Sequence, residues 1–427
     1  MPILLKNALI LLGSKPCKFR RASLLIENNK ISSLNPKKLP KEAQIIDCSK
    51  KIVLPGLINA HTHSPMSILR GIGDDLPLAK WLKEAMWPRE KKLSPSDIKT
   101  GASLAICEML RNGTTCFSDH YFHMDSVADA AKEAGIRAVL GYSMIDMGNF
   151  EERGKSELKI ADAFAKKIKE MRHSLLTPSI NPHAINTCSK ELLENSATLA
   201  KKYDCVLHIH AAETRAELSH SLKTHKLRPI QLLEKCGCLT KNTVLAHGVY
   251  VTKGEISQIA KKGASVCTCP VSNLKLASGG APPIPQYLHN KVNLCIGTDG
   301  AASNNSLSLF ESAKVGAIEQ KNFHFDASAI KADDYLHMLC EGGAKALKIN
   351  AGKIKEGALA DIILLDANSS NLMPFSNNAG WLIYSAGSQN ISDVIINGEF
   401  VMKERQILFL NEEKIFEAAQ KIAERIN

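Results

Sequence analysis

Aromatic residues are scarce in this chain, and only 5% of its residues are Phe, Trp or Tyr. Proteins that bind single-stranded nucleic acids without sequence preference stack the bases on aromatic side chains. The formal net charge of +11 does not replace such a stacking surface, because the basic residues are spread along the whole chain. The charge therefore indicates a basic solvated surface, and we expect no nucleic-acid partner.

Long apolar runs are missing as well. No stretch approaches the roughly 20 apolar residues that a transmembrane helix needs, so we expect no membrane partner. The N-terminal segment NALILLG is apolar but short, and charged residues soon follow it. It lacks a small-residue cleavage site, and it predicts a first strand rather than a signal peptide.

Cysteine pairs with metal-binding spacing are also absent. The 12 cysteines are scattered and include no CxxC pair. CGC at 236–238 and CTC at 267–269 have the wrong spacing for a zinc knuckle. In a reducing cytosol such residues act as small hydrophobic side chains. We therefore expect a cytoplasmic protein without structural disulfides.

Strand-like and helix-like segments alternate through most of the 427 residues. Continuous apolar strands are typical of parallel sheets that are buried on both faces. Eight such strands joined by helices predict an α/β fold with a (β/α)8 TIM-type barrel over residues 56–351. The predicted strand segments are KIVLPGLINAH, TTCFSDH, IRAVLGYSM, LLTPSINPH, CVLHIHAAE, TVLAHGV, ASVCTCPVSN and VNLCIGTDG.

The two ends of the chain have a different pattern. Residues 1–55 and 352–427 contain short strands separated by turns and lack the alternation with helices. We expect both ends to meet in one small discontinuous β-sandwich domain. The final stretch, NEEKIFEAAQKIAERIN, has helical periodicity and predicts a C-terminal helix.

The motif NAHTHS places two histidines one residue apart at the end of the first predicted barrel strand. Residues i and i+2 of a strand point to the same side, so His61 and His63 project together. Taken alone, the motif is more often a pair of hydrogen-bonded histidines in a packed strand. The same end of other strands carries further polar residues, which are His183, His208, His210, Glu213, His247 and Asp299.

The carboxyl ends of barrel strands meet at one rim, where barrel enzymes place their chemistry. Imidazoles and one carboxylate gathered there predict a catalytic site for a divalent ion of the zinc type. His208 and His210 form a second HxH pair, and spacing alone does not choose the ligand between them. No lysine stands at a strand end where it would bridge two ions, which favours a single ion.

These motifs also resemble a known family. PGLINAHTHSPMSILRG, HIHAAETRAE, LAHGV and GTDGAASNNSLSLFE are similar to the amidohydrolase superfamily. Within it, DDLPLAKWLKEAMWPRE and SNNSLSLFE resemble the 5-methylthioadenosine/S-adenosylhomocysteine deaminase branch, which is related to chlorohydrolases and guanine deaminases. The similarity extends over essentially the whole chain.

The resemblance implies a role for each matching residue. His61, His63, His210 and Asp299 would bind the ion, with His210 favoured over His208 because it precedes xxE. The catalytic residues implied are Glu213, His247 and Asp299, of which Glu213 and Asp299 also contact the substrate. The remaining substrate contacts implied are Glu90 to the ribose hydroxyls, His183 to the purine, Trp81 to the pocket wall and Arg153 to the homocysteine carboxylate.

The expected reaction is a hydrolytic deamination that releases ammonia. It converts S-adenosylhomocysteine to S-inosylhomocysteine and 5-methylthioadenosine to 5-methylthioinosine, with adenosine and 5′-deoxyadenosine as further substrates. Some relatives carry a second arginine where this chain has Tyr142. This departure bears on the preference for a substrate with an amino-acid tail. The expected cofactor is one Zn²⁺, with Fe²⁺ or Mn²⁺ as alternatives. The resemblance also implies a homo-oligomer, a dimer or a tetramer.

Two rival interpretations stay open at this point. Guanine deaminases and triazine chlorohydrolases share the metal ligands but have no use for a ribose-binding carboxylate such as Glu90. A non-catalytic barrel that serves as a binding protein is the other rival. The intact set of metal-ligating and acid–base residues argues against it.

Overall fold

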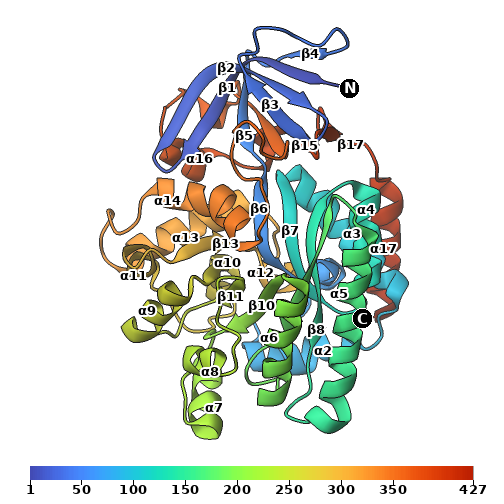
Figure 1. The fold of residues 1–427 in the computed structure, drawn as a ribbon, viewed down its shortest axis with the longest axis vertical. Helices are drawn as coiled ribbons and strands as arrows, with labels where there is room; N and C mark the ends of the chain where they lie inside the picture. The colour runs from blue at the N-terminus through green and yellow to red at the C-terminus, as the bar shows by residue number, and fades with distance from the viewer. Residues whose placement is uncertain (427) are drawn as a thin grey trace.

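The computed structural model describes residues 1–426, and it contains two sheets (Figure 1). One is an eight-stranded parallel sheet that nearly closes into a barrel, and helices surround it. The other is a separate nine-stranded sheet, which lies at the top of Figure 1. The predicted TIM-type barrel is therefore confirmed.

The barrel strands follow one another in space in the same order as in the sequence. Every residue of the first two barrel strands is buried, as expected for a sheet that is covered by helices outside and filled by side chains inside. Across the gap between the last and the first barrel strand, the backbone N–H of Asp299 donates to the carbonyl of His61 at 3.0 Å. The strands are β6 (Leu57–Thr62), β7 (Thr114–Tyr121), β8 (Arg137–Met144), β9 (Leu176–Pro182), β10 (Val206–Ala211), β11 (Thr243–His247), β12 (Ser265–Thr268) and β13 (Asn293–Ile296).

Amphipathic helices connect the barrel strands, and polar residues mark where several of them begin. The helix predicted from KELLENSATLAKKY spans Lys190–Tyr203, and the Ser189 side chain accepts a hydrogen bond from the Leu192 backbone at its N-terminus. The α-helices between the barrel strands and after the last one are α1 (Leu78–Lys80), α2 (Trp87–Glu90), α3 (Pro95–Arg111), α4 (Met124–Ala134), α5 (Lys155–Met171), α6 (Lys190–Tyr203), α7 (Arg215–His225), α8 (Pro229–Lys235), α9 (Lys253–Lys262), α10 (Pro270–Lys275), α11 (Ile284–His289), α12 (Ala301–Asn304), α13 (Leu309–Phe323), α14 (Ala332–His337) and α15 (Gly343–Ala346).

Short 3-10 and π-helical turns complete the chain between the longer elements. These are η1 (Ser64–Leu69), η2 (Trp81–Met86), η3 (Phe150–Gly154), η4 (Met338–Gly342), η5 (Ser370–Leu372) and η6 (Ser388–Asn390).

The nine-stranded sheet combines strands from both ends of the chain. Its central pairing joins β5 to β14 in antiparallel register, with Val53 opposite Leu364. Long-range strand pairing of this kind cannot be read from local sequence patterns. The strands are β1 (Ile3–Ser14), β2 (Cys17–Glu27), β3 (Lys30–Leu34), β4 (Gln44–Asp47), β5 (Lys51–Pro55), β14 (Ile362–Asp366), β15 (Ile391–Ile396), β16 (Glu399–Lys403) and β17 (Gln406–Ile407).

The remaining helices, α16 (Ala379–Ser385) and α17 (Glu412–Ile426), lie in the C-terminal part of the chain. The helix α17 was expected from its periodicity, and it packs against α3 of the barrel. Ion pairs join the two helices, one between Arg111 and Glu412 and one between Arg425 and Asp97, each at 2.6 Å.

The apolar run KIVLPGLINAH divides at Gly56, where the chain passes from one sheet to the other. A side chain at this position would collide with Thr115, whose Oγ1 lies only 2.0 Å from the place of a Cβ atom. The backbone N–H of Gly56 donates to the carbonyl of Asp361 at 2.9 Å. The residue is therefore glycine because the two sheets approach closely there.

A buried ion pair holds the two sheets together at the start of β8. The Arg137 guanidinium donates two hydrogen bonds to the Asp361 carboxylate, at 2.6 and 3.0 Å, and a third to the Ser174 carbonyl. Asp361 also accepts from the backbone N–H of Asn397 at 2.8 Å. Because Arg137 is the first residue of its strand, the amino ends of the barrel strands face the nine-stranded sheet. The carboxyl ends of the barrel strands lie on the side away from the nine-stranded sheet.

Replacing Asp361 by alanine should lower the free energy of unfolding by about 3–5 kcal/mol, since it leaves the buried Arg137 without a counter-charge. Urea denaturation measures this change. The matched control is Glu133→Ala, which removes the exposed ion pair with Lys99 and should change the stability by less than about 1 kcal/mol. Equal effects of the two substitutions would contradict the structural role of the buried pair.

Candidate metal centre and catalytic site

Three histidines and one aspartate converge at the carboxyl ends of β6, β10 and β13. The Nε2 atom of His63 lies 3.2 Å from the Nε2 atom of His210 and 3.3 Å from Oδ1 of Asp299. The Nε2 atom of His61 lies 3.5 Å from the same carboxylate oxygen. The possible ligand atoms of His61, His63 and Asp299 all lie within 4.8 Å of one another, and so do those of His61, His210 and His247.

The hydrogen bonds of the histidine rings suit metal binding. The Nδ1 atom of His63 donates to the carbonyl of His120 at 2.5 Å, and that of His210 donates to the carbonyl of His183 at 2.7 Å. These bonds leave the Nε2 lone pairs free to face the cluster. Burial lowers the pKa of His61 to about 4, so its ring is neutral at pH 7.

His61 also provides a direct test of whether the residues fit an ion. Its Nε2 atom is buried and has no hydrogen-bond partner among residues 1–426. An unsatisfied buried polar atom costs about 1–3 kcal/mol, and a divalent ion among these imidazoles and the Asp299 carboxylate would satisfy it. The donor set of three imidazoles and a carboxylate matches catalytic zinc-type sites. The residues present therefore fit a divalent ion.

The structure separates the roles of the two histidines of the second HxH pair. His208 lies deeper in the barrel, where its Nε2 atom is 3.0 Å from Nδ1 of His61 and its Nδ1 atom is 3.1 Å from Oγ of Ser118. His210 lies beside His63. The geometry therefore favours His210 as the ligand and gives His208 the task of orienting His61.

Asp299 lies in a dense network of donors. Its Oδ2 atom accepts from the hydroxyls of Ser272 at 2.6 Å and Ser303 at 3.0 Å, and its Oδ1 atom accepts from the backbone of Gly300 at 2.9 Å. Burial raises the pKa of Asp299, but the nearby rings of His61, His63 and His247 outweigh burial and hold the pKa well below its usual range. The carboxylate is therefore ionised. The two serines were not predicted as part of the site, although Ser272 lies in the predicted strand segment ASVCTCPVSN and Ser303 follows the segment VNLCIGTDG.

Glu213 and His247 form a pair beside this cluster. The Oε2 atom of Glu213 lies 3.8 Å from Nε2 of His247. The Nδ1 atom of His247 donates to Oδ1 of Asn273 at 2.8 Å, which fixes the ring. Burial lowers the pKa of His247, yet the Glu213 carboxylate raises it to about 9, and burial raises the pKa of Glu213 itself. A carboxyl group with a raised pKa is suited to exchange protons near neutral pH.

Glu90 reaches the same rim from outside the barrel. Its Oε1 atom accepts a hydrogen bond of 2.6 Å from the hydroxyl of Tyr121, the last residue of β7. Burial raises the pKa of Glu90. Trp81 lies on the preceding turns and is only 5% exposed, within the main hydrophobic core, whereas Trp87 is 43% exposed.

His183 and Arg153 occupy different surroundings. His183 is the residue directly after β9. Its Nδ1 atom lies 2.8 Å from Oγ1 of Thr187, and its ring centroid lies 4.8 Å from that of His210. Arg153 is half exposed and pairs with Glu157 at 3.5 Å. Within residues 1–426, no hydrogen bond or ion pair joins Arg153 to the histidine cluster. Tyr142 also interacts with Glu157. Burial, followed by this interaction, raises the pKa of Tyr142 to about 12.

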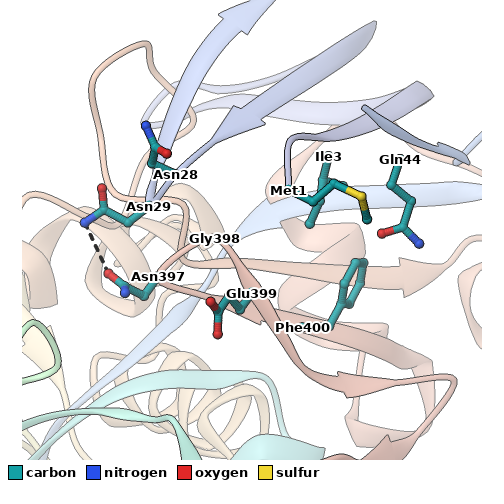
Figure 2. Close-up of a pocket in the computed structure, with 9 residues that line it drawn as sticks. All are labelled: Met1, Ile3, Asn28, Asn29, Gln44, Asn397, Gly398, Glu399 and Phe400. Carbon is teal, nitrogen blue, oxygen red and sulfur yellow. Dashed lines mark hydrogen bonds between the residues drawn. The ribbon is translucent and has the colours of Figure 1, made fainter. Parts of the chain in front are cut away.

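A hollow of about 510 Å³ lies elsewhere, at the nine-stranded sheet (Figure 2). The close-up shows a hydrogen bond of 3.3 Å between Asn29 and Asn397 at its edge. Of the described residues that line it, Glu399 alone has an ionisable side chain, and none is histidine or cysteine. The hollow lacks the acid–base and ligand groups of the histidine cluster. Its lining residues are Met1, Ile3, Asn28, Asn29, Gln44, Asn397, Gly398, Glu399 and Phe400.

Comparison with known proteins agrees with this arrangement. The model of the Amidohydrolase family matches residues 52–401. This chain belongs to the Amidohydrolase family. The family membership expected from the sequence motifs is thereby confirmed, and the chain is a hydrolase.

Individual relatives of this amidohydrolase are similar over nearly their whole length. The chain is 42% identical to a 5′-deoxyadenosine deaminase of Methanocaldococcus jannaschii, over 99% of both chains. It is 38% identical to a 5-methylthioadenosine/S-adenosylhomocysteine deaminase of Pyrococcus abyssi, over 98% of this chain and 97% of the relative. The crystal structure of an adenosine deaminase from Xanthomonas campestris with bound zinc superposes with a TM-score of 0.93 at 32% identity, covering 99% and 98% of the two chains.

Among residues 1–426, none of the helices combines the length and the apolar character required to cross a bilayer.

Proposed function

We propose that this amidohydrolase is a metal-dependent deaminase of adenosine-type nucleosides. It converts S-adenosylhomocysteine and 5-methylthioadenosine to the corresponding inosine compounds with release of ammonia, and it also accepts adenosine and 5′-deoxyadenosine. The observation that carries this proposal is the pair of Glu213 and the buried His247, 3.8 Å apart, beside the cluster of three histidines and Asp299. The names of its relatives, 5′-deoxyadenosine deaminase and 5-methylthioadenosine/S-adenosylhomocysteine deaminase, support the substrate class.

The ion would be held by His61, His63, His210 and Asp299. When bound, a divalent ion lowers the pKa of water to about 7 and so makes hydroxide available at neutral pH. Zn²⁺ is the proposed ion, and Fe²⁺ or Mn²⁺ suit the same imidazole-rich set. The zinc in the similar adenosine deaminase structure supports this choice.

The residues of the chain divide the proton transfers among them. Glu213 takes a proton from the attacking water and delivers it to N1 of the purine, which makes C6 more electrophilic. Asp299, ionised, accepts a hydrogen bond from the same water. His247, fixed by Asn273, orients the oxygen as it bonds to C6. The second proton of the added water then passes from the C6 hydroxyl to the amino group, the C6–N bond breaks, and ammonia leaves as the C6 carbonyl forms.

Substrate contacts orient the nucleoside from a distance. Glu90 accepts hydrogen bonds from the ribose hydroxyls, and His183 contacts the purine ring. Trp81 and Arg153 are proposed as the pocket wall and as the contact to an amino-acid tail. Orientation of this kind supplies part of the rate enhancement because the reacting atoms are held close together.

A coupled ammonia assay tests the proposal. The zinc-loaded protein is compared on S-adenosylhomocysteine, 5-methylthioadenosine, 5′-deoxyadenosine, adenosine and guanine. Ammonia release from the nucleosides is the expected result. Activity on guanine alone would favour the guanine deaminase alternative, and the absence of bound metal from the purified protein would favour the non-catalytic one.

Glu90→Ala should lower kcat/KM for nucleosides by about 10- to 100-fold, because hydrogen bonds to a charged group contribute about 1.5–3 kcal/mol. Ammonia release from free adenine, which has no ribose, should not change. The matched control is Glu84→Gln, an exposed glutamate on the preceding turn, which should behave as the wild type. Unchanged nucleoside activity in Glu90→Ala would overturn the assignment of a ribose-bearing substrate.

A division of the chain into two domains accompanies this proposal. We propose that residues 1–55 and 352–427 form one composite β-sandwich domain with the C-terminal helix, and that residues 56–351 form the hydrolase barrel. The nine-stranded sheet drawn from both chain ends supports this division. A homo-oligomer, dimer or tetramer, and a cytoplasmic location stay predictions.

A further inference from the structure

A second buried glutamate lies directly behind the catalytic loop of β10. Glu217 is 5% exposed and belongs to the first turn of α7. Its Oε1 atom accepts from the backbone N–H of Ala212 at 2.9 Å, and its Oε2 atom accepts from that of Glu213 at 2.7 Å. Thr214, the residue that caps α7, accepts from the Glu217 backbone at 3.0 Å. In an ordinary capping box this carboxylate would reach the backbone of the capping residue, but here it reaches the two residues before it.

The loop that Glu217 holds is conformationally demanding. Ala212 has a φ of 53°, in the left-handed region that non-glycine residues seldom adopt. Such a backbone persists only where surrounding contacts impose it. The two carboxylate oxygens of Glu217 provide those contacts from one side of the loop.

The other side of the same loop supports the segment that carries His247. The carbonyl of Ala212 accepts from the backbone of Val249 at 2.9 Å and of Tyr250 at 2.7 Å. The carbonyl of Ala211 accepts from Gly248 at 3.1 Å. Any shift of Ala212 therefore moves both Glu213 and the segment that follows His247.

We propose that Glu217 is a positioning residue for catalysis, which sets the geometry of the Glu213–His247 pair through the backbone of Ala212 and Glu213. Two oxygens are required because two backbone N–H groups point at one side chain. A glutamine in its place offers one oxygen and turns an amide nitrogen toward the second N–H group, which is left without an acceptor. The catalytic consequence rests on the proposed deaminase function, whereas the loop geometry does not.

The first test is Glu217→Gln in the zinc-loaded enzyme. We expect kcat to fall by about 100-fold, the loss that a displacement of about 1 Å produces, while KM and zinc content stay within about twofold of the wild type. The matched control is Asp97→Asn, a buried first-turn carboxylate of α3 that caps its helix and pairs with Arg425. It should leave kcat unchanged. A loss of zinc in Glu217→Gln, or an unchanged kcat, would overturn the proposal.

A double-mutant comparison separates positioning from a general structural role. If Glu217 acts through Glu213, then Glu217→Gln should change the residual kcat of a Glu213→Gln enzyme by less than about twofold. A purely structural defect would lower kcat by the same factor in both backgrounds, and that result would refute the positioning role.

A third measurement does not depend on activity. Hydrogen–deuterium exchange in Glu217→Gln should be faster than in the wild type for residues 211–217 and for residues 247–251, but not for α3. If the wild-type enzyme releases no ammonia from any nucleoside, the proposed function fails, and exchange still decides the role of Glu217. Unchanged exchange in both segments would refute the positioning role even in an active deaminase.

Discussion

Glu213→Gln is expected to lower kcat for nucleoside deamination by about 10²–10⁴-fold, the usual contribution of general acid–base catalysis. A glutamine at this position keeps the size and polarity of the side chain but cannot take the proton from water and pass it to N1. Because Glu213 lies beside His247 and outside the set of ligands, metal content should stay at the wild-type level. Steady-state kinetics with metal analysis on the same preparation measure both quantities.

The control for this substitution is Glu234→Gln, which removes a surface ion pair with Lys262 and should leave kcat within about twofold of the wild type. A Glu213→Gln enzyme that retained wild-type kcat would show that another group carries the proton. A parallel loss of metal would instead show that Glu213 supports the ion, and the assignment of its role would then be wrong.

His61→Ala should lower the affinity for the divalent ion by more than about 100-fold and abolish measurable deamination. Changes in groups that merely orient metal ligands already weaken binding by about 10–100-fold, and in the proposed site His61 is itself a ligand. Its Nε2 atom is buried and faces the cluster, and no residue in the described part of the chain, 1–426, forms a hydrogen bond with it. Competition with a chelator, followed by metal analysis, measures the affinity.

Two comparisons keep this result interpretable. His123→Ala removes an exposed histidine at the start of α4 and should retain both metal and activity. Since His61 is fully buried and its removal leaves a cavity, His61→Asn serves as a second variant with less lost volume. If both His61 variants bound the ion as tightly as the wild type and stayed folded, the cluster would not be the metal site.

The barrel and the first part of its site could be predicted from local patterns. Strand residues alternate between two faces, so HxH alone places His61 and His63 on one side. Parallel strands buried on both faces read as continuous apolar runs, and their carboxyl ends meet at one rim. These two regularities predict that His183, His210 and Asp299 gather at the same rim as the first pair.

Other features were decided by distances that the sequence does not encode. The alternation of strand residues places His208 and His210 on the same face of their strand. Only the folded barrel sets His208 deeper, with its ring against Ser118. Glu90 lies in a run of charged residues, a pattern that is typical of a solvent-exposed segment. In the folded chain it lies at the rim, where it accepts a hydrogen bond from Tyr121.

The sequence by itself determined the periodicity of the elements and the chemical types available at each strand end, because both depend on neighbouring residues in the chain. Tertiary structure alone decided which of these groups come within bonding distance. Glu217 supports Glu213 because α7 folds back over its own strand end, and Asp361 meets Arg137 across more than 200 residues of chain. Contacts of that kind arise from packing and barrel closure, which no local pattern specifies.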